Sequence, residues 1–180
     1  MTAISANGIT IEYETHGQEG NPALLLIRGL GSQMIHWPAA LMQRLAAAGF
    51  YVVTFDNRDA GLSTKFEAAG AMDVADLMQR AKAGEDIEVP YLLDDMAADV
   101  IGLMDALSIV TAHVAGISMG GAIAQLLAAK HGGRLRSMTS IMAQSGNLDV
   151  PQGSLQAMAA LMRAGGDEST RDGAIAANMA

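Results

Sequence analysis

Short apolar runs alternate along the chain with longer segments in which apolar residues recur every three or four positions. Residues 9–15 (ITIEYET) alternate apolar and polar side chains, which predicts a strand with one buried face. Residues 23–27 (ALLLI) and 50–55 (FYVVTF) are continuous apolar runs, which favour strands buried on both faces. Between these runs, Pro38 and Gly49 bracket a short predicted helix.

The same alternation continues in the second half of the chain. A strong amphipathic helix is predicted from residue 91 onward by apolar side chains spaced three and four apart: Leu92, Met96, Val100, Leu103 and Leu107. We expect strands at 111–117 and 135–142, and between them a helix from 119 to 131 that Gly132 and Gly133 end. Strands that alternate with helices predict an α/β fold with a mostly parallel, doubly wound sheet.

The segment after residue 150 follows another pattern. Leu155, Met158 and Met162 predict an amphipathic helix, and a second helical start follows at 167–169. No further strand pattern returns to the sheet, so the sequence resembles an interrupted fold. The apolar face of this segment either covers a pocket as a lid or packs against other helices.

Composition limits the class of protein. The chain has 180 residues, of which 51% are hydrophobic and 17% charged, so we expect one folded domain and not a disordered chain. The net charge of −8 repels phosphate backbones and argues against nucleic acid as a partner. There is no cysteine, which excludes disulfides, thiolate metal sites and cysteine nucleophiles.

No targeting or cofactor signal is evident. The N-terminal residues MTAISANG carry neither a basic region nor an apolar stretch, and no apolar run approaches the roughly 18 residues that a membrane span needs. We therefore expect a cytoplasmic protein with no membrane partner. No histidine and carboxylate cluster has ligand spacing, and no GxGxxG follows a strand, so neither a metal nor a nucleotide cofactor is expected.

The most informative motif is GISMGG, residues 116–121, where an apolar strand passes into a helix. A serine at such a turn is held in a strained backbone conformation, and its side chain projects above the sheet. Larger side chains two residues on either side would collide with the turn, which explains Gly116 and Gly120. We interpret Ser118 as a nucleophile. The alternative is a glycine-rich turn that serves packing alone.

These residues resemble the α/β-hydrolase family, and three other segments support the resemblance. LLLIRGLGSQMIHWP (24–38) resembles its oxyanion loop, FDNRDAGLST (55–64) its D-x-R-x-x-G-x-S turn, and residues 91–121 its helix, strand and nucleophile elbow. The combination is most similar to the esterase branch of aclacinomycin methylesterase-like hydrolases, over roughly residues 9–145. The resemblance implies a core over 1–148 and the start of a helical cap over 149–180.

The resemblance assigns roles to particular residues. Ser118 matches the nucleophile, and the backbone N–H groups of Leu30 and Met119 match the oxyanion hole. Arg28 stands where many relatives carry histidine, which places a cation either at the pocket mouth or in a pair with Asp56. His36 and Trp37 begin the first helix beside the oxyanion loop, where they line the pocket or serve capping and packing.

Asp56 and Arg58 resemble catalytic residues in type, but their position in a tight turn favours a structural ion pair beneath the pocket. Among the other histidines, we expect His113 to be buried and hydrogen-bonded within its strand. After Ser118 the sequence contains only His131, which lies about 20 Å away along the helix that follows. Asp149 resembles the acid position of some relatives but lacks a partner histidine.

The family order places an acid and then a histidine after the nucleophile, on loops beyond later strands. We therefore expect a serine hydrolase of small carboxylic esters whose acid and base come from a C-terminal hydrolase fragment or from another copy of the chain. The last strand, residues 135–142, would form an open sheet edge that favours such association. The alternative is a catalytically incomplete module for binding or assembly that keeps the hydrolase pocket.

Overall fold

The computed structural model describes residues 2–70, 76–77, 79–80, 83–146, 154 and 156. The chain divides into two compact units, Met1–Ser145 and Gly146–Ala180, and the first of them carries the sheet. The predicted boundary after residue 148, the helix pattern at 155–162 and the cap over 149–180 lie outside the described residues, apart from Ser154 and Gln156. They remain predictions.

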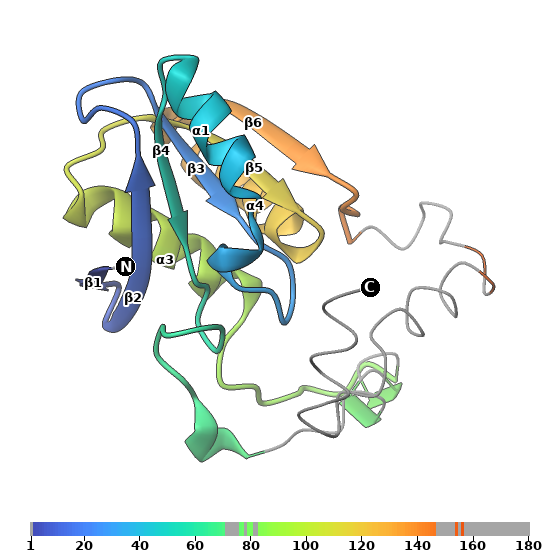
Figure 1. Ribbon diagram of the computed structural model, residues 1–180. Coiled ribbons are helices and arrows are strands. Elements are labelled where there is room, and N and C mark those ends of the chain that lie inside the picture. The colour runs from blue at the N-terminus through green and yellow to red at the C-terminus, as the bar shows by residue number, and fades with distance from the viewer. Residues whose placement is uncertain are drawn as a thin grey trace. The chain divides into compact units, whose positions relative to one another are not determined.

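The first unit is built on a sheet of six strands in the order β1-β2-β4-β3-β5-β6 (Figure 1). The strands β4, β3, β5 and β6 pair in parallel, and β1 and β2 join antiparallel at one side. This arrangement confirms the mostly parallel α/β sheet. The bounds are β1 Thr2–Ala6, β2 Ile9–His16, β3 Ala23–Ile27, β4 Tyr51–Phe55, β5 Ala112–Ile117 and β6 Leu135–Ile141.

Strand β1 is the one element of the sheet that our pattern analysis did not predict. Four of its five side chains are exposed or half-buried, so the apolar signal of a core strand is weak. Asn7 and Gly8 have φ values of 48° and 76° and connect β1 to β2 as a two-residue hairpin turn. The Asn-Gly pair was the available signal for this hairpin.

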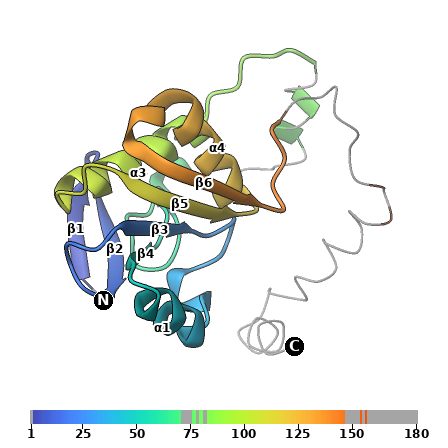
Figure 2. The same cartoon turned by 90° about the horizontal axis from the view of Figure 1, so that it is seen from above.

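Helices cover both faces of the sheet. Helix α1 (Ala39–Ala47) packs on one face, and α3 (Leu93–Ala106) and α4 (Met119–His131) pack on the other, as Figure 2 shows. These three helices confirm the predicted ones. Short 3₁₀ turns are η1 (Met34–His36), η2 (Glu67–Ala69) and η3 (Gly132–Arg134).

The central strand β3 carries the core. Leu25 and Ile27 belong to the large cluster beneath α3 and α4, while Leu24 and Leu26 belong to the cluster beneath α1. All five β3 residues are buried, as the continuous apolar run predicted. Full burial of one such side chain contributes about 1.5–3 kcal/mol. The strand is therefore a rigid support for the loop that follows it.

Strand β6 ends the sheet that the structure describes. Six of its seven residues are exposed, and Met138 and Ile141 remain 39% and 43% accessible. The predicted edge position is confirmed. No helix among the described residues has the length and apolarity to cross a membrane.

The parallel strands β3, β4 and β5 end at the same edge of the sheet. The loops after them, beginning at Arg28, Asp56 and Ser118, therefore meet there (Figure 1). In open α/β sheets this carboxyl edge is where ligands bind.

Candidate active site

Ser118 lies between the last residue of β5 and the first residue of α4. Its backbone adopts φ 55° and ψ −124°, a conformation that a non-glycine residue rarely occupies. The side chain is exposed, and its backbone N–H donates to the Ile141 carbonyl at 2.9 Å. The predicted strained turn is therefore confirmed. Its catalytic role remains a prediction.

Glycines allow this turn to form. A Cβ atom at Gly116 would overlap the backbone of Gly120, and a Cβ atom at Gly120 would overlap the carbonyl groups of Ile27 and Arg28. The strand, the helix and the end of β3 are thus closer together than any side chain permits. This explains the GxSxG spacing in steric terms.

The backbone N–H groups of Met119 and Leu30, near Ser118, differ from the other N–H groups of this junction. Gly121 and Ala122 donate to the Ser118 carbonyl at 2.8 and 3.2 Å, as in an ordinary first helical turn. Within the described part of the chain, neither the Met119 N–H nor the Leu30 N–H has a hydrogen-bond partner. Free N–H groups at a helix start attract negative charge.

The loop after β3 approaches Ser118 closely. A Cβ atom at Gly29 would lie 3.0 Å from the Ser118 Cβ atom and 3.5 Å from its hydroxyl oxygen. Gly29 therefore places the backbone of residue 30 beside the serine. This arrangement suits the predicted oxyanion role of Leu30, which stays a prediction.

The turn after β4 holds this loop in place. The Asp56 carboxylate accepts the Met34 N–H at 2.7 Å and the Leu62 N–H at 3.0 Å. The Asn57 amide donates to the Arg28 carbonyl at 3.0 Å. Both side chains are buried, with 3% and 5% accessibility. Asp56 and Asn57 therefore fix the backbone next to Ser118.

The predicted ion pair between Asp56 and Arg58 is wrong. Arg58 donates instead to Asp99 of α3, from Nε to Oδ2 and from Nη2 to Oδ1, both at 2.7 Å. The hydrogen bond with Asp99 raises the pKa of Arg58 above its usual value, and both side chains are buried. Asp56 bonds to backbone groups because Arg58 extends away toward α3. The turn is still held by a structural ion pair, but with another partner.

Sequence reasoning missed Asp99, although a signal was present. Asp99 lies three residues after Met96 and four before Leu103, on the apolar face of α3. A carboxylate on a buried helix face needs a partner, and Arg58 supplies it. Asn7 adds a hydrogen bond to Asp99 Oδ1 at 2.8 Å.

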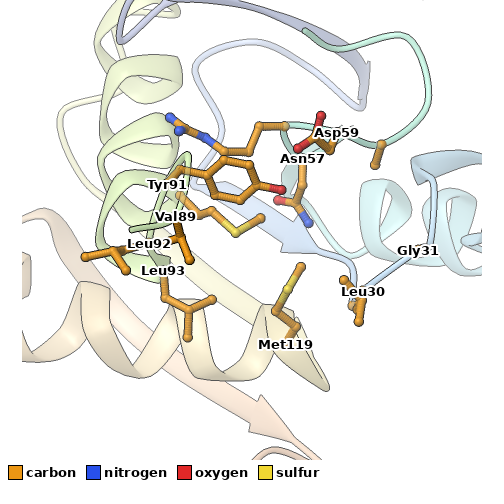
Figure 3. A pocket seen from close by; sticks show the side chains of 13 residues that line it. Leu30, Gly31, Asn57, Asp59, Val89, Tyr91, Leu92, Leu93 and Met119 are labelled. Atoms are coloured by element: carbon orange, nitrogen blue, oxygen red, sulfur yellow. The ribbon is translucent and has the colours of Figure 1, made fainter. Parts of the chain in front are cut away.

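A cavity of about 350 Å³ opens beside the elbow (Figure 3). Gly29, Leu30 and Met119, which surround Ser118, form one end of its lining. The other lining residues come from the turn after β4 and from the segment that enters α3: Gly31, Asn57, Arg58, Asp59, Ala60, Val89, Tyr91, Leu92, Leu93 and Met96.

Tyr91 is the most prominent polar residue of this cavity. In Figure 3 its ring lies across the pocket, and its hydroxyl points toward Asn57 and Asp59. Burial and a hydrogen bond to Asp59 raise the pKa of Tyr91 to about 12. The Arg58 guanidinium carbon lies 5.0 Å from the centre of the ring and stacks over it. We did not single out Tyr91 or Asp59 from the sequence.

Arg28, His36 and Trp37 form a separate cluster and are not among the residues that line this cavity. The Arg28 guanidinium carbon lies 4.7 Å from the Trp37 ring centre, and the Arg28 Nη2 group donates to the Ser32 hydroxyl at 2.7 Å. The alternative pair with Asp56 is wrong, because both Asp56 oxygens bond to backbone N–H groups. Burial lowers the pKa of Arg28. His36 accepts the Gln33 N–H at 3.1 Å, which is a capping role.

No described histidine contacts Ser118. His113 forms a hydrogen bond of 2.8 Å with Ser137 and an edge contact with Phe50, so the expected hydrogen bond is confirmed, although His113 is only half-buried. His131 ends α4, at the opposite end of the helix from Ser118. His16 ends β2, with Glu14 at 3.9 Å. Among the described residues, no cluster of three or more histidine and acidic side chains could hold a metal ion.

Comparison with known proteins agrees with this geometry. Residues 22–179 match a family model described as the alpha/beta hydrolase fold. The chain is 33% identical over 147 residues to rhodomycin D methylesterase DauP of Streptomyces sp. (strain C5), covering 82% of this chain and 43% of the relative. It is 31% identical over 127 residues to 3-oxoadipate enol-lactonase 2 of Acinetobacter baylyi, covering 69% of this chain and 38% of the relative.

A solved structure is similar over nearly the whole chain. The enol-lactonase from Burkholderia xenovorans LB400 superposes with a TM-score of 0.67 and 22% identity, over 99% of this chain and 65% of the other. The chain spans less than half the length of the curated relatives named above. The family-model match and the similarity to the methylesterase confirm the resemblance to the esterase branch. The chain belongs to the α/β-hydrolase fold family.

Proposed function

We propose that this chain supplies the nucleophile and the oxyanion donors of a carboxylic-ester hydrolase. The observation that carries the proposal is the strained backbone of Ser118, at φ 55° and ψ −124°, with an exposed side chain beside two N–H groups that lack acceptors. Strain of this kind is retained where the surrounding structure and the function require it. The relatives' names, methylesterase and enol-lactonase, describe the opening of acyl–oxygen bonds.

The reaction follows from the positions of these groups. The Ser118 oxygen attacks the ester carbonyl carbon and passes its proton to a base. The carbonyl oxygen becomes an oxyanion, which the Leu30 and Met119 N–H groups stabilise. One such donor contributes about 2.7–4 kcal/mol to the transition state. The carbon–oxygen bond to the alcohol then breaks, the base returns its proton to the alcohol, and water hydrolyses the acyl-enzyme.

We propose that the base and its acid come from polypeptide outside these 180 residues. In the described structure the Ser118 hydroxyl has no hydrogen-bond partner, and His131 lies at the far end of α4. The open edge of β6 is a surface on which further strands could pair. A C-terminal hydrolase fragment or a second copy of the chain would bind there.

The test measures hydrolysis of p-nitrophenyl acetate by the 180-residue chain, alone and mixed with a fragment that carries the remaining hydrolase strands. We expect activity in the mixture and near-background rates without the fragment. Ser118→Ala should abolish the activity of the mixture and leave the circular dichroism spectrum and the melting temperature nearly unchanged, because the side chain is exposed. Unchanged turnover in Ser118→Ala would overturn the nucleophile assignment.

A second candidate function is a binding module that retains the pocket without turnover. The observation that favours it is the absence of a base beside Ser118 in the described structure. Intact-mass measurement of the protein isolated from its natural source separates the two. A companion fragment that carries the remaining hydrolase strands and a histidine, and that restores activity, supports the hydrolase. A stable, fragment-free chain that binds esters without hydrolysing them supports the module.

A further inference from the structure

The cavity beside Ser118 has two chemically different ends. Near the elbow and along α3 its walls are apolar, formed by Leu30, Met96, Met119 and the side chains before α3. The polar lining residues are Asn57, Arg58 and Asp59 of the turn after β4, and Tyr91 (Figure 3). A ligand whose ester group lies at the Leu30 and Met119 end of the cavity therefore meets polar groups at its distal end.

The polar end offers hydrogen-bond acceptors. The Asn57 amide nitrogen donates one of its two hydrogens to the Arg28 carbonyl, which orients the amide, and its oxygen is available as an acceptor for a ligand. Tyr91 lines the same part of the cavity as Asp59, and its phenolic oxygen can accept a hydrogen bond as well as donate one. Asp59 Oδ1 accepts the Phe66 N–H at 2.6 Å, and a carboxylate has acceptor capacity beyond this bond.

The nearby cation does not reverse this polarity. Arg58 uses Nε and Nη2 for Asp99, and its guanidinium stacks over the rings of Tyr91 and Phe66. It therefore fixes the orientation of the Tyr91 ring. The raised pKa of Tyr91, about 12, keeps its hydroxyl protonated at neutral pH.

From this arrangement we infer that Asn57, Asp59 and Tyr91 form a specificity site for a hydroxyl group carried on an apolar body. On the proposed function, on which this inference rests for the reacting group, the preferred substrate is an ester whose distal end bears a hydrogen-bond donor. A volume of about 350 Å³ accommodates one aromatic or alicyclic ring with its ester group. Apolar walls supply affinity, and the acceptors supply selectivity.

Three matched esters test the inference: methyl para-hydroxyphenylacetate, methyl para-methoxyphenylacetate and methyl phenylacetate. The first can donate a hydrogen bond, the second can only accept, and the third does neither at that position. Dissociation constants are measured by calorimetry and by methyl NMR of Met119 in the full 180-residue chain carrying Ser118→Ala. We expect the hydroxyl ester to bind about fivefold more tightly than the methoxy ester, as one net hydrogen bond provides.

Variants assign the preference to the polar end. Tyr91→Phe keeps the ring and removes the hydroxyl, and Asp59→Asn keeps the shape and removes the charge. Each should reduce the preference to less than twofold. Tyr51→Phe, which removes a hydroxyl at the opposite end of β4, is the matched control and should retain it. Circular dichroism checks that each variant is folded. If Tyr91→Phe does not fold, Asp59→Asn alone tests the assignment.

Equal affinities for the three esters, binding that does not saturate, or a preference that persists in both variants would overturn the inference. Failure of the proposed function has a different signature. If Ser118 is not a nucleophile, the mixture with the C-terminal fragment hydrolyses no ester, while the hydroxyl preference measured in the Ser118→Ala chain is unaffected. A hydrolase without the preference would leave Ser118 in its role and remove only the specificity site.

Discussion

A single methyl group at Gly116 or Gly120 would overlap backbone atoms at the junction that holds Ser118. At the scale of single residues, the candidate site depends on such close approaches and on the atoms that they bring together. Ser118 is exposed, but the glycines around it are buried. Substitutions near the serine therefore have different consequences for stability and for activity.

Gly120→Ala should destabilise the protein by about 1–3 kcal/mol, the usual result of forcing an extra group into a packed site. The new Cβ atom would overlap the carbonyl groups of Ile27 and Arg28 and displace the Met119 N–H from the serine. Urea unfolding measures the change. Gly132→Ala is the control, because a Cβ atom there meets nothing within 4 Å. Equal stability of the two variants would show that the junction tolerates a side chain.

The raised pKa of Tyr91 predicts that the stability of the chain depends on pH in the alkaline range. Its pKa of about 12 in the folded chain lies above its ordinary value of 10.0, so the unfolded chain loses this proton first as the pH rises. The contribution to stability is complete below about pH 10 and is lost as the pH rises toward 12. In Tyr91→Phe, the unfolding free energy should fall less steeply between about pH 10 and pH 12 than in the parent chain. Identical slopes would contradict the prediction, and Tyr51→Phe serves as the control.

At the scale of elements, the ion pair of Arg58 with Asp99 connects the turn after β4 to helix α3. Asp56 and Asn57 of the same turn hold the loop after β3 by hydrogen bonds to its backbone. Three segments far apart in the sequence thus position the backbone next to Ser118. The pair holds these segments in place. Removal of one partner would leave the other charge buried and uncompensated.

Asp99→Ala should destabilise the chain by about 3–5 kcal/mol, because Arg58 would remain buried without its partner. Thermal and urea unfolding measure the loss. Asp105→Ala breaks the exposed pair with Arg134 and should change stability by less than about 1 kcal/mol. The double variant Arg58→Met with Asp99→Leu should recover much of the stability. A loss in Asp99→Ala no larger than that in Asp105→Ala would refute the role of the pair.

At the scale of the whole molecule, β6 leaves one edge of the described sheet without a partner strand. Six of its seven residues are exposed, and Met138 and Ile141 add apolar surface. An open edge with these features favours pairing with another chain. The net charge of −8 opposes association and makes it dependent on salt.

We therefore predict concentration-dependent association of the 180-residue chain that grows with salt concentration. Thr139→Lys places a charge in the middle of β6 and should increase the monomer fraction in sedimentation velocity experiments. Gln18→Lys adds the same charge in an exposed loop and should have little effect. Association that is equally strong in both variants would show that β6 is not the surface involved.

Much of the fold was predictable because its signals are local. The apolar runs of β3 and β4 and the spacing in α3 follow from the period of each element. The Ser118 turn was predictable because Gly116 and Gly120 satisfy a steric requirement within five residues. Strand β1 escaped the pattern because its side chains are largely exposed, although Asn7 and Gly8 signalled its turn.

The sequence by itself determined the order of strands and helices from β2 onward, the carboxyl-edge position of the loops and the strained serine. Only the tertiary structure decided that Arg58 pairs with Asp99 and that Tyr91 and Asp59 enter the cavity while Arg28 and Trp37 contact each other. Arg58 and Asp99 are 41 residues apart, and several carboxylates were equally available along the chain. Packing of α3 against the sheet selects among them, because it alone sets which side chains are within reach.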